Sequence, residues 1–355
     1  MLSVRNSHPL AALSIPAVVL LVSILALNGC GSGNAPSAGG GSGGTGTSAQ
    51  TSTLSNTVLL GYIWNSADRS IHSIAGVPGS SYLGRIVGPA STYTSAAISS
   101  VANLALAQDG KGNLILIALP SGAPQTVLTS LSGIAQVVFS RGGQYAAVWL
   151  PGTKKAWLLQ QLSSATPSAT AVMTAGPVIG AAVSDQGIVL TATSAQGGVQ
   201  VSTATASGAG ASILLLGGYG GMAFVHGTDN AVIADRRQDV ASLAQSVSTK
   251  PTVQTLAAPA QTLVQPVAVE ISTDGRWALL ANGGEQSIAR FDLTGATTAA
   301  KTALTFTPAQ VLPLVGNGIF ALTTTGSGPT WIVDATAAAP RVLFIPAPST
   351  GAGSQ

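Results

Sequence analysis

The sequence predicts an all-β protein, a seven-bladed β-propeller of four-stranded antiparallel blades, preceded by a signal peptide and a disordered Gly/Ser linker. Three observations predict this architecture. An apolar amino-terminal run ends at the chain's single cysteine, Cys30, and a tract rich in glycine and serine follows it. Beyond residue 56, short β-rich runs recur with a period of about 43 residues, which is typical of propellers.

These observations divide the 355-residue chain into four segments. We expect a signal peptide over residues 1–29 and a flexible tether over 30–56. We expect the propeller over residues 57–348 and a disordered tail over 349–355.

The amino-terminal segment has the layout of a secretory signal. Arg5 supplies a positive charge, and the run from Leu10 to Leu27 is uncharged and rich in Ala, Val, Leu and Ile. Its length approaches the roughly 20 residues that span a bilayer as a helix. An uncleaved transmembrane anchor, with an incidental cysteine, is therefore the alternative.

The four residues that end at Cys30, Leu-Asn-Gly-Cys, resemble a bacterial lipobox. The resemblance implies diacylglycerol on the thiol, cleavage after Gly29 and N-acylation of the new terminus. Two or three acyl chains anchor a domain stably, whereas one chain holds weakly. The predicted partner of this segment is thus the membrane, reached through lipid on Cys30. Gly31 and Ser32 follow with no Asp, so by family analogy we expect an exported protein at the outer membrane of the cell envelope.

The composition limits which bonds, ligands and partners the exported part of the chain can have. With Cys30 bearing lipid, no disulfide and no thiolate ligand is left, so stability must come from packing and hydrogen bonds. Only 7 % of residues are charged, and the net charge is +3. No block of Lys and Arg occurs, which argues against nucleic-acid binding. Residues 31–56 bury too little apolar surface to fold, which favours a tether.

Seven recurring strands define the repeat. They are LLGYIW (59–64), NLALAQ (103–108), QYAAVWL (144–150), GIVLTAT (187–193), NAVIAD (230–235), RWALLAN (276–282) and GIFALTT (318–324). Seven such units fill residues 57–348 with almost nothing left over.

The sixth unit shows the logic of one blade. PVAVEIS (266–272) is apolar and suits the innermost strand, and Thr273-Asp274-Gly275 suits a tight hairpin. RWALLANGG and QSIARFDL supply the next two strands, and TALTFT (302–307) is expected as the outer strand. Similar turns recur at residues 140–143 and 184–187, and loosely at 227–230.

The stretches YIWNSADRSIHSI (62–74) and ISTDGRWALLANGGEQSIARFDL (271–293) resemble the YVTN type of seven-bladed propeller, the group that includes lactonase-like and amine-dehydrogenase-subunit-like proteins. The resemblance covers the whole propeller and implies a fold rather than an activity. Residues 232–244 depart most, since they are polar where a clean strand is expected. Closure has two alternatives: residues near 50–57 add a strand to blade 1, or side-chain packing alone closes the ring.

Candidate chemistry is sparse. His72 and His226 are the only histidines outside the signal and do not have metal-ligand spacing, so we expect no metal and no cofactor. Alignment of the fifth and sixth units places His226 and Glu270 near one rim of the channel, where a carboxylate beside an imidazole can do acid–base work. The alternative is that Glu270 lines a wet channel and His226 caps a turn.

Two further groups are candidates for contacts. Arg236 and Arg237 lie in the densest charge cluster and mark either a partner-binding loop or a solvated hairpin. Trp64, Trp149 and Trp277 fall on equivalent strands, which favours packing between blades over an aromatic shelf for sugars.

The resulting hypothesis is a membrane-anchored envelope lipoprotein whose propeller is a non-catalytic binding or scaffold module for protein or glycan partners. The alternative is an enzyme, either a lactonase-like hydrolase or a periplasmic propeller resembling a redox subunit. Fold alone does not decide between them.

Overall fold

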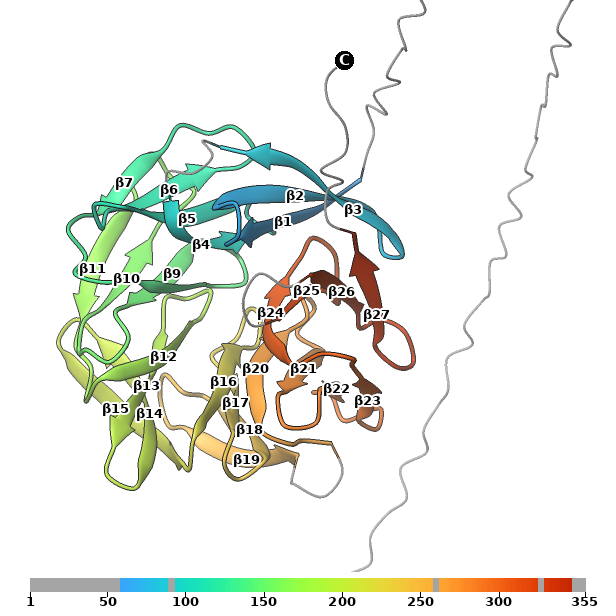
Figure 1. Cartoon of the computed structure of the whole chain (residues 1–355). Coiled ribbons are helices and arrows are strands. Elements are labelled where there is room, and N and C mark those ends of the chain that lie inside the picture. The colour runs from blue at the N-terminus through green and yellow to red at the C-terminus, as the bar shows by residue number, and fades with distance from the viewer. Residues whose placement is uncertain (1–57, 89–92, 258–261, 325–328, 347–355) are drawn as a thin grey trace, which may run out of the picture. The chain divides into compact units, whose positions relative to one another are not determined.

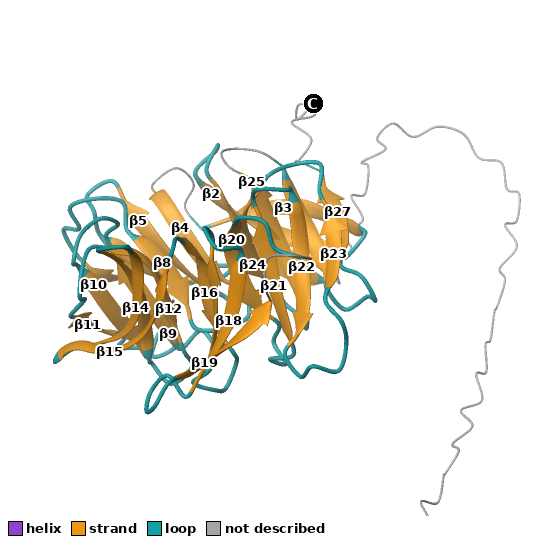
Figure 2. Cartoon of the chain, turned by 90° about the horizontal axis from the view of Figure 1, so that it is seen from below, coloured by secondary structure: helices purple, strands orange, loops and turns teal. Residues whose placement is uncertain are grey.

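The computed structural model of the protein describes residues 58–88, 93–257, 262–324 and 329–346 (Figure 1). All regular secondary structure in these ranges consists of β-strands (Figure 2). None of the described residues forms a helix long and apolar enough to cross a bilayer. The predicted signal peptide, Cys30, the tether and the predicted tail lie outside the described residues.

The strands form seven antiparallel sheets, which we number as blades 1 to 7, and in each the strand order follows the chain. Blade 1 has three described strands, β1 Leu59–Asn65, β2 Ser70–Val77 and β3 Ser80–Val87. Blades 2 to 4 have four each: β4 Tyr93–Ser99, β5 Leu104–Asp109, β6 Leu114–Ala118, β7 Gln125–Leu128; β8 Gln136–Phe139, β9 Tyr145–Trp149, β10 Ala156–Gln160, β11 Ser168–Val172; β12 Val178–Val183, β13 Val189–Ala195, β14 Gly198–Thr205, β15 Gly208–Leu216. Blades 5 to 7 also have four each: β16 Tyr219–Phe224, β17 Ala231–Asp235, β18 Val240–Gln245, β19 Thr252–Ala257; β20 Pro266–Ile271, β21 Trp277–Asn282, β22 Ser287–Asp292, β23 Ala300–Ala303; β24 Pro308–Pro313, β25 Ile319–Thr324, β26 Thr330–Asp334, β27 Arg341–Ile345.

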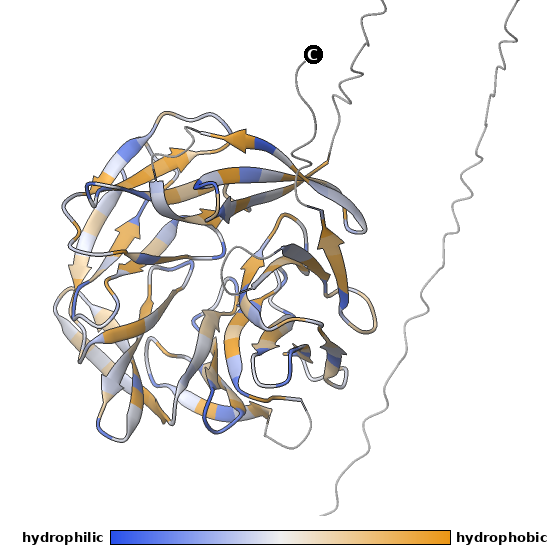
Figure 3. Ribbon diagram, viewed as in Figure 1, coloured by the Kyte–Doolittle hydropathy of each residue, from blue (hydrophilic) through white to orange (hydrophobic). Residues whose placement is uncertain are grey.

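The blades follow one another around a central axis, with the first strand of blades 2 to 7 innermost (Figure 1). Apolar residues concentrate in the strands and polar residues in the turns (Figure 3). The predicted all-β, seven-bladed propeller is confirmed.

The hairpins that leave the inner strands of blades 3, 4 and 6 share one device, a buried serine. Its hydroxyl accepts the N–H of the first residue of the next strand or, in blade 4, of the residue just before that strand, and its carbonyl accepts the N–H of a glycine with positive φ. The serines are Ser140, Ser184 and Ser272, and the glycines are Gly143, Gly187 and Gly275. Since only glycine adopts this φ without strain, the repeated turn fixes where each inner strand ends.

The hydrophobic core lies between the blades rather than within them. Between blades 6 and 7, for example, Trp277 and Leu279 of β21 pack with Phe320 and Leu322 of β25, and all four side chains are buried. Burying one such side chain stabilises the fold by about 1.5–3 kcal/mol. Trp149 likewise packs against the next blade, as predicted.

Strand β1 closes the ring by contacting the blades on both sides of it. Val315 of blade 7 donates its N–H to the carbonyl of Leu60 at 2.7 Å. Tyr62 donates its N–H to the Oγ of Ser100 in blade 2 at 3.1 Å. An apolar cluster of blades 1 and 7 surrounds this seam. Among the described residues, closure therefore combines side-chain packing with backbone hydrogen bonds, while residues 50–57 lie outside them.

Two local predictions need correction. The outer strand of blade 6 is Ala300–Ala303, earlier than the predicted 302–307, because Phe306 instead stacks on Trp331 of blade 7 at 4.8 Å between ring centroids. The polar stretch 232–244 forms two regular strands, because its charged residues lie in the turn between the two strands or at the strand end next to that turn.

Candidate functional site

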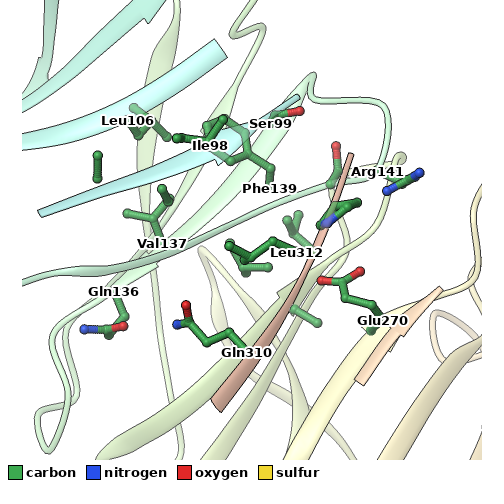
Figure 4. A pocket seen from close by; sticks show the side chains of 18 of the residues that line it. Ile98, Ser99, Leu106, Gln136, Val137, Phe139, Arg141, Glu270, Gln310 and Leu312 are labelled. Atoms are coloured by element: carbon green, nitrogen blue, oxygen red, sulfur yellow. The ribbon is translucent and has the colours of Figure 1, made fainter. Parts of the chain in front are cut away.

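A cavity of about 220 Å³ occupies the channel at the centre of the ring (Figure 4). All seven blades contribute to its wall. The inner strands β4, β8, β12, β16, β20 and β24 line it, and β1 lines it with Tyr62 and Trp64. Most of the described residues in the wall are apolar, and the charged ones among them are Arg141 and Glu270.

Arg141 lies in the turn after β8 and crosses the channel mouth. Its Nη2 donates to the Oγ1 of Thr273, which belongs to blade 6 on the other side of the ring. Its Nε and Nη1 are buried and have no hydrogen-bond partner in the described protein. Burial lowers the pKa of Arg141, and the charges of Glu270 and Asp185 oppose that effect. A guanidinium stays protonated in proteins.

Glu270, near the end of β20, faces the cavity and is half-buried. Its position deep in the ring raises the pKa of its carboxyl from 4.5 to about 7 by desolvation, against the attraction of Arg141 and of the Ile271 N–H. Burial, and secondarily the charge of Glu270, also raises the pKa of Tyr219. Both forms of the Glu270 carboxyl are thus populated near neutral pH.

Asp185, in the turn after β12, joins three blades at the rim of the channel. Its Oδ1 accepts the N–H of Gly142 at 2.6 Å, and its Oδ2 accepts the N–H of Gly227 at 3.2 Å. The same Oδ2 lies 2.6 Å from Nδ1 of His226. Burial raises the pKa of Asp185, but these hydrogen bonds outweigh it and hold the pKa below its usual value.

The structure therefore joins His226 to Asp185 and not to Glu270. Glu270 lines the cavity, whereas His226 is a half-exposed rim residue outside the cavity wall. The sequence hypothesis named neither Arg141 nor Asp185. A signal was present, because Arg141, Asp185, His226 and Thr273 occupy the same position in the repeated turn, two residues after the last residue of the inner strand.

Arg236 and Arg237 lie in the hairpin that joins β17 to β18, away from the rim that carries Arg141 and Asp185. Since β17 runs away from the rim, this hairpin lies at the opposite face of the ring. Both arginines are exposed. Beneath them the buried carboxylate of Asp235 accepts four backbone N–H groups, from Gly217, Gly218, Arg237 and Gln238. Asp235 thus shapes this turn.

Within the described residues, no three His, Cys, Asp or Glu side chains are grouped so as to hold a metal ion. His72 bonds to Ser70 and Asp68 in blade 1.

Fold and channel together define a seven-bladed β-propeller with a small central cavity. No family model and no curated protein matches the chain. Among solved structures, apo AztD from Citrobacter koseri is 15 % identical over 83 % of this chain and 84 % of its own, with a TM-score of 0.54. A functionally unknown protein from Desulfotomaculum acetoxidans DSM 771 is 14 % identical over 81 % of this chain and 99 % of its own, with a TM-score of 0.54.

PorZ of Porphyromonas gingivalis, described as an essential bacterial surface component of the type-IX secretion system, is also similar. It is 13 % identical over 84 % of this chain and 40 % of its own, with a TM-score of 0.53. At these identities the similarities establish the fold alone.

Proposed function

We propose that the protein is an exported lipoprotein, anchored to the cell envelope through Cys30, whose propeller binds protein or glycan partners without catalysis. The observation that supports binding is the channel cavity with its unpartnered donors on Arg141. A concave, largely apolar pocket with a few convergent polar groups is the usual form of a binding site.

The lipobox-like residues that end at Cys30 and the glycine-rich tract after them support the anchor. PorZ supports the setting, because it is a propeller-containing protein described as a bacterial surface component. The proposal for this chain does not extend to secretion.

The anchor is tested by labelling cells with radioactive palmitate and fractionating them. The wild-type chain is expected to carry label and to sediment with membranes, and Cys30→Ser to lose both. A Cys30→Ser chain that is retained in membranes would support the transmembrane alternative.

Binding is tested by crosslinking the protein in intact envelopes and identifying what is captured. A reproducible protein or glycan partner is expected, and its capture should fall on mutation of the channel rim. A chain that captures nothing reproducible contradicts the binding proposal.

One observation favours hydrolysis as a second candidate function. The Glu270 carboxyl, with a pKa of about 7, has the proton affinity of a general acid or base. A screen of lactones with wild type and Glu270→Gln discriminates, since turnover that disappears in the variant would replace the binding proposal.

A further inference from the structure

The strongest unexplained feature of the channel is Arg141, a half-buried cation whose hydrogen-bonding capacity is mostly unused. A guanidinium has five N–H donors. Thr273 accepts from Nη2, which leaves Nε and Nη1 without a partner although both are shielded from solvent. Leaving such donors unpaired costs free energy, more so for a charged group.

Glu270 does not fill this role. Of the two carboxylates that act on Arg141 electrostatically, Glu270 has the larger effect, yet no ion pair among the described residues joins the two side chains. Asp185, the other carboxylate that acts on Arg141, is already engaged by Gly142, Gly227 and His226. Neither carboxylate therefore accepts a hydrogen bond from Nε or Nη1 of Arg141.

A ligand that satisfies these donors must carry acceptor oxygens, and the planar guanidinium matches carboxylates well. The adjoining wall restricts the rest of the ligand. Figure 4 shows Arg141 and Glu270 on one side of the cavity, with the apolar side chains of Phe139 and Leu312 between them and the amides of Gln136 and Gln310.

Size restricts the ligand further. The volume of about 220 Å³ is below the roughly 300–1,000 Å³ of pockets for drug-sized molecules. A sugar chain or a folded peptide does not fit inside the cavity and could be bound only at its rim, whereas an acid with a short apolar body fits inside.

We propose that the channel binds a small organic acid, with its carboxylate at the guanidinium of Arg141, where it accepts from one of the two unpartnered nitrogens, and with its apolar part against Phe139 and Leu312. The inference rests on the proposed function in one respect, that the ligand is bound and released unchanged.

The test uses the full-length chain purified in detergent and a probe series of acetate, butyrate and hexanoate, with butyramide and hexanamide as uncharged controls. Isothermal titration is expected to detect the acids, with affinity rising along the series, and to detect the amides at least tenfold more weakly. A purely structural Arg141 predicts binding of neither class, and that result overturns the proposal. Equal binding of acids and amides overturns it as well.

Variants localise the site. Arg141→Met is expected to weaken hexanoate binding at least tenfold, and Arg236→Met, at an exposed arginine on the opposite face, to leave it unchanged. Because Arg141→Met also removes the bond to Thr273, Leu312→Trp is a second variant that fills the cavity and keeps Arg141. Loss of binding in Leu312→Trp supports the channel site, and retained binding overturns it.

Two failures are distinguishable. Recovery of the probe acids by NMR after incubation reports whether they are unchanged. Conversion of an acid contradicts non-catalytic binding and leaves the ligand class standing. A chain that captures an envelope partner but binds no probe acid overturns this inference and leaves the proposed function standing.

Discussion

The carboxyl of Glu270 makes a specific prediction about how stability depends on pH. In the folded protein its pKa is raised from 4.5 to about 7, mainly by desolvation. Below pH 4.5 the group is protonated in both folded and unfolded chains and contributes no difference. Between pH 4.5 and about 7 the folded protein holds a proton that the unfolded chain releases, so stability falls as pH rises. Above about pH 7 the loss is complete.

The magnitude follows from the size of the pKa difference. A tenfold change in proton affinity is worth about 1.4 kcal/mol, so the rise in pKa corresponds to about 3 kcal/mol. Glu270→Gln has no titrating group and escapes this loss. The free energy of unfolding of Glu270→Gln minus that of wild type is expected to rise by about 3 kcal/mol from pH 4 to pH 8.

Urea denaturation of both proteins at pH 4, 6 and 8 measures this difference, and the other titrating groups cancel in it. Glu285→Gln, at a glutamate beside Lys301 outside the channel, controls for removal of a charge. If the difference between Glu270→Gln and wild type is the same at all three pH values, the carboxyl does not lie in a desolvated site.

Three further predictions concern packing and the rim. Phe320→Ala is expected to lower the free energy of unfolding by about 3–5 kcal/mol, because this side chain is fully buried, with exposed Phe344→Ala as the control in the same urea titration. Gly180→Ala places a methyl group against the Tyr219 ring and should lower the free energy of unfolding by about 1–3 kcal/mol. In a double-mutant cycle, Tyr219→Ala should recover part of that loss, and strictly additive effects of the two substitutions would contradict the contact. Asp185→Ala should lower the free energy of unfolding by about 1.5–3 kcal/mol or more at neutral pH and by less in acid. The pKa of Asp185 is lowered in the folded protein, so the stability that its carboxylate contributes is lost as pH falls. An equal loss at about pH 3 and pH 7 in thermal unfolding would contradict this prediction.

The repeat and its turns were predictable because they depend on local chemistry. Gly275 ends a hairpin at φ +71°, as the Thr-Asp-Gly stretch predicts, and Trp277 starts the next strand. Alternation of short apolar runs with turn residues sufficed to count the blades, since each blade repeats the same local pattern.

The channel site was not predictable in the same way. The bond from Arg141 to Thr273 joins blade 3 to blade 6, and no local pattern encodes a contact across a ring. The proximity of His226 to Asp185 likewise depends on how neighbouring blades are rotated. Alignment of the repeated turns predicts that these residues lie on the same face of the ring. Which of them are in contact depends on how the blades are arranged around the ring.

The seam at β1 has a consequence for how the chain folds. Leu60 and Val315 meet there from opposite ends of the propeller, so this contact closes a loop that spans most of the ring. Contacts of such sequence separation form slowly, because most of the chain must be ordered first. Until they form, the apolar faces of the first and last sheets stay open to solvent, and unpaired sheet surface of this kind promotes aggregation. A chain of this design would therefore gain most from a chaperone that shields its two end blades until the ring is complete.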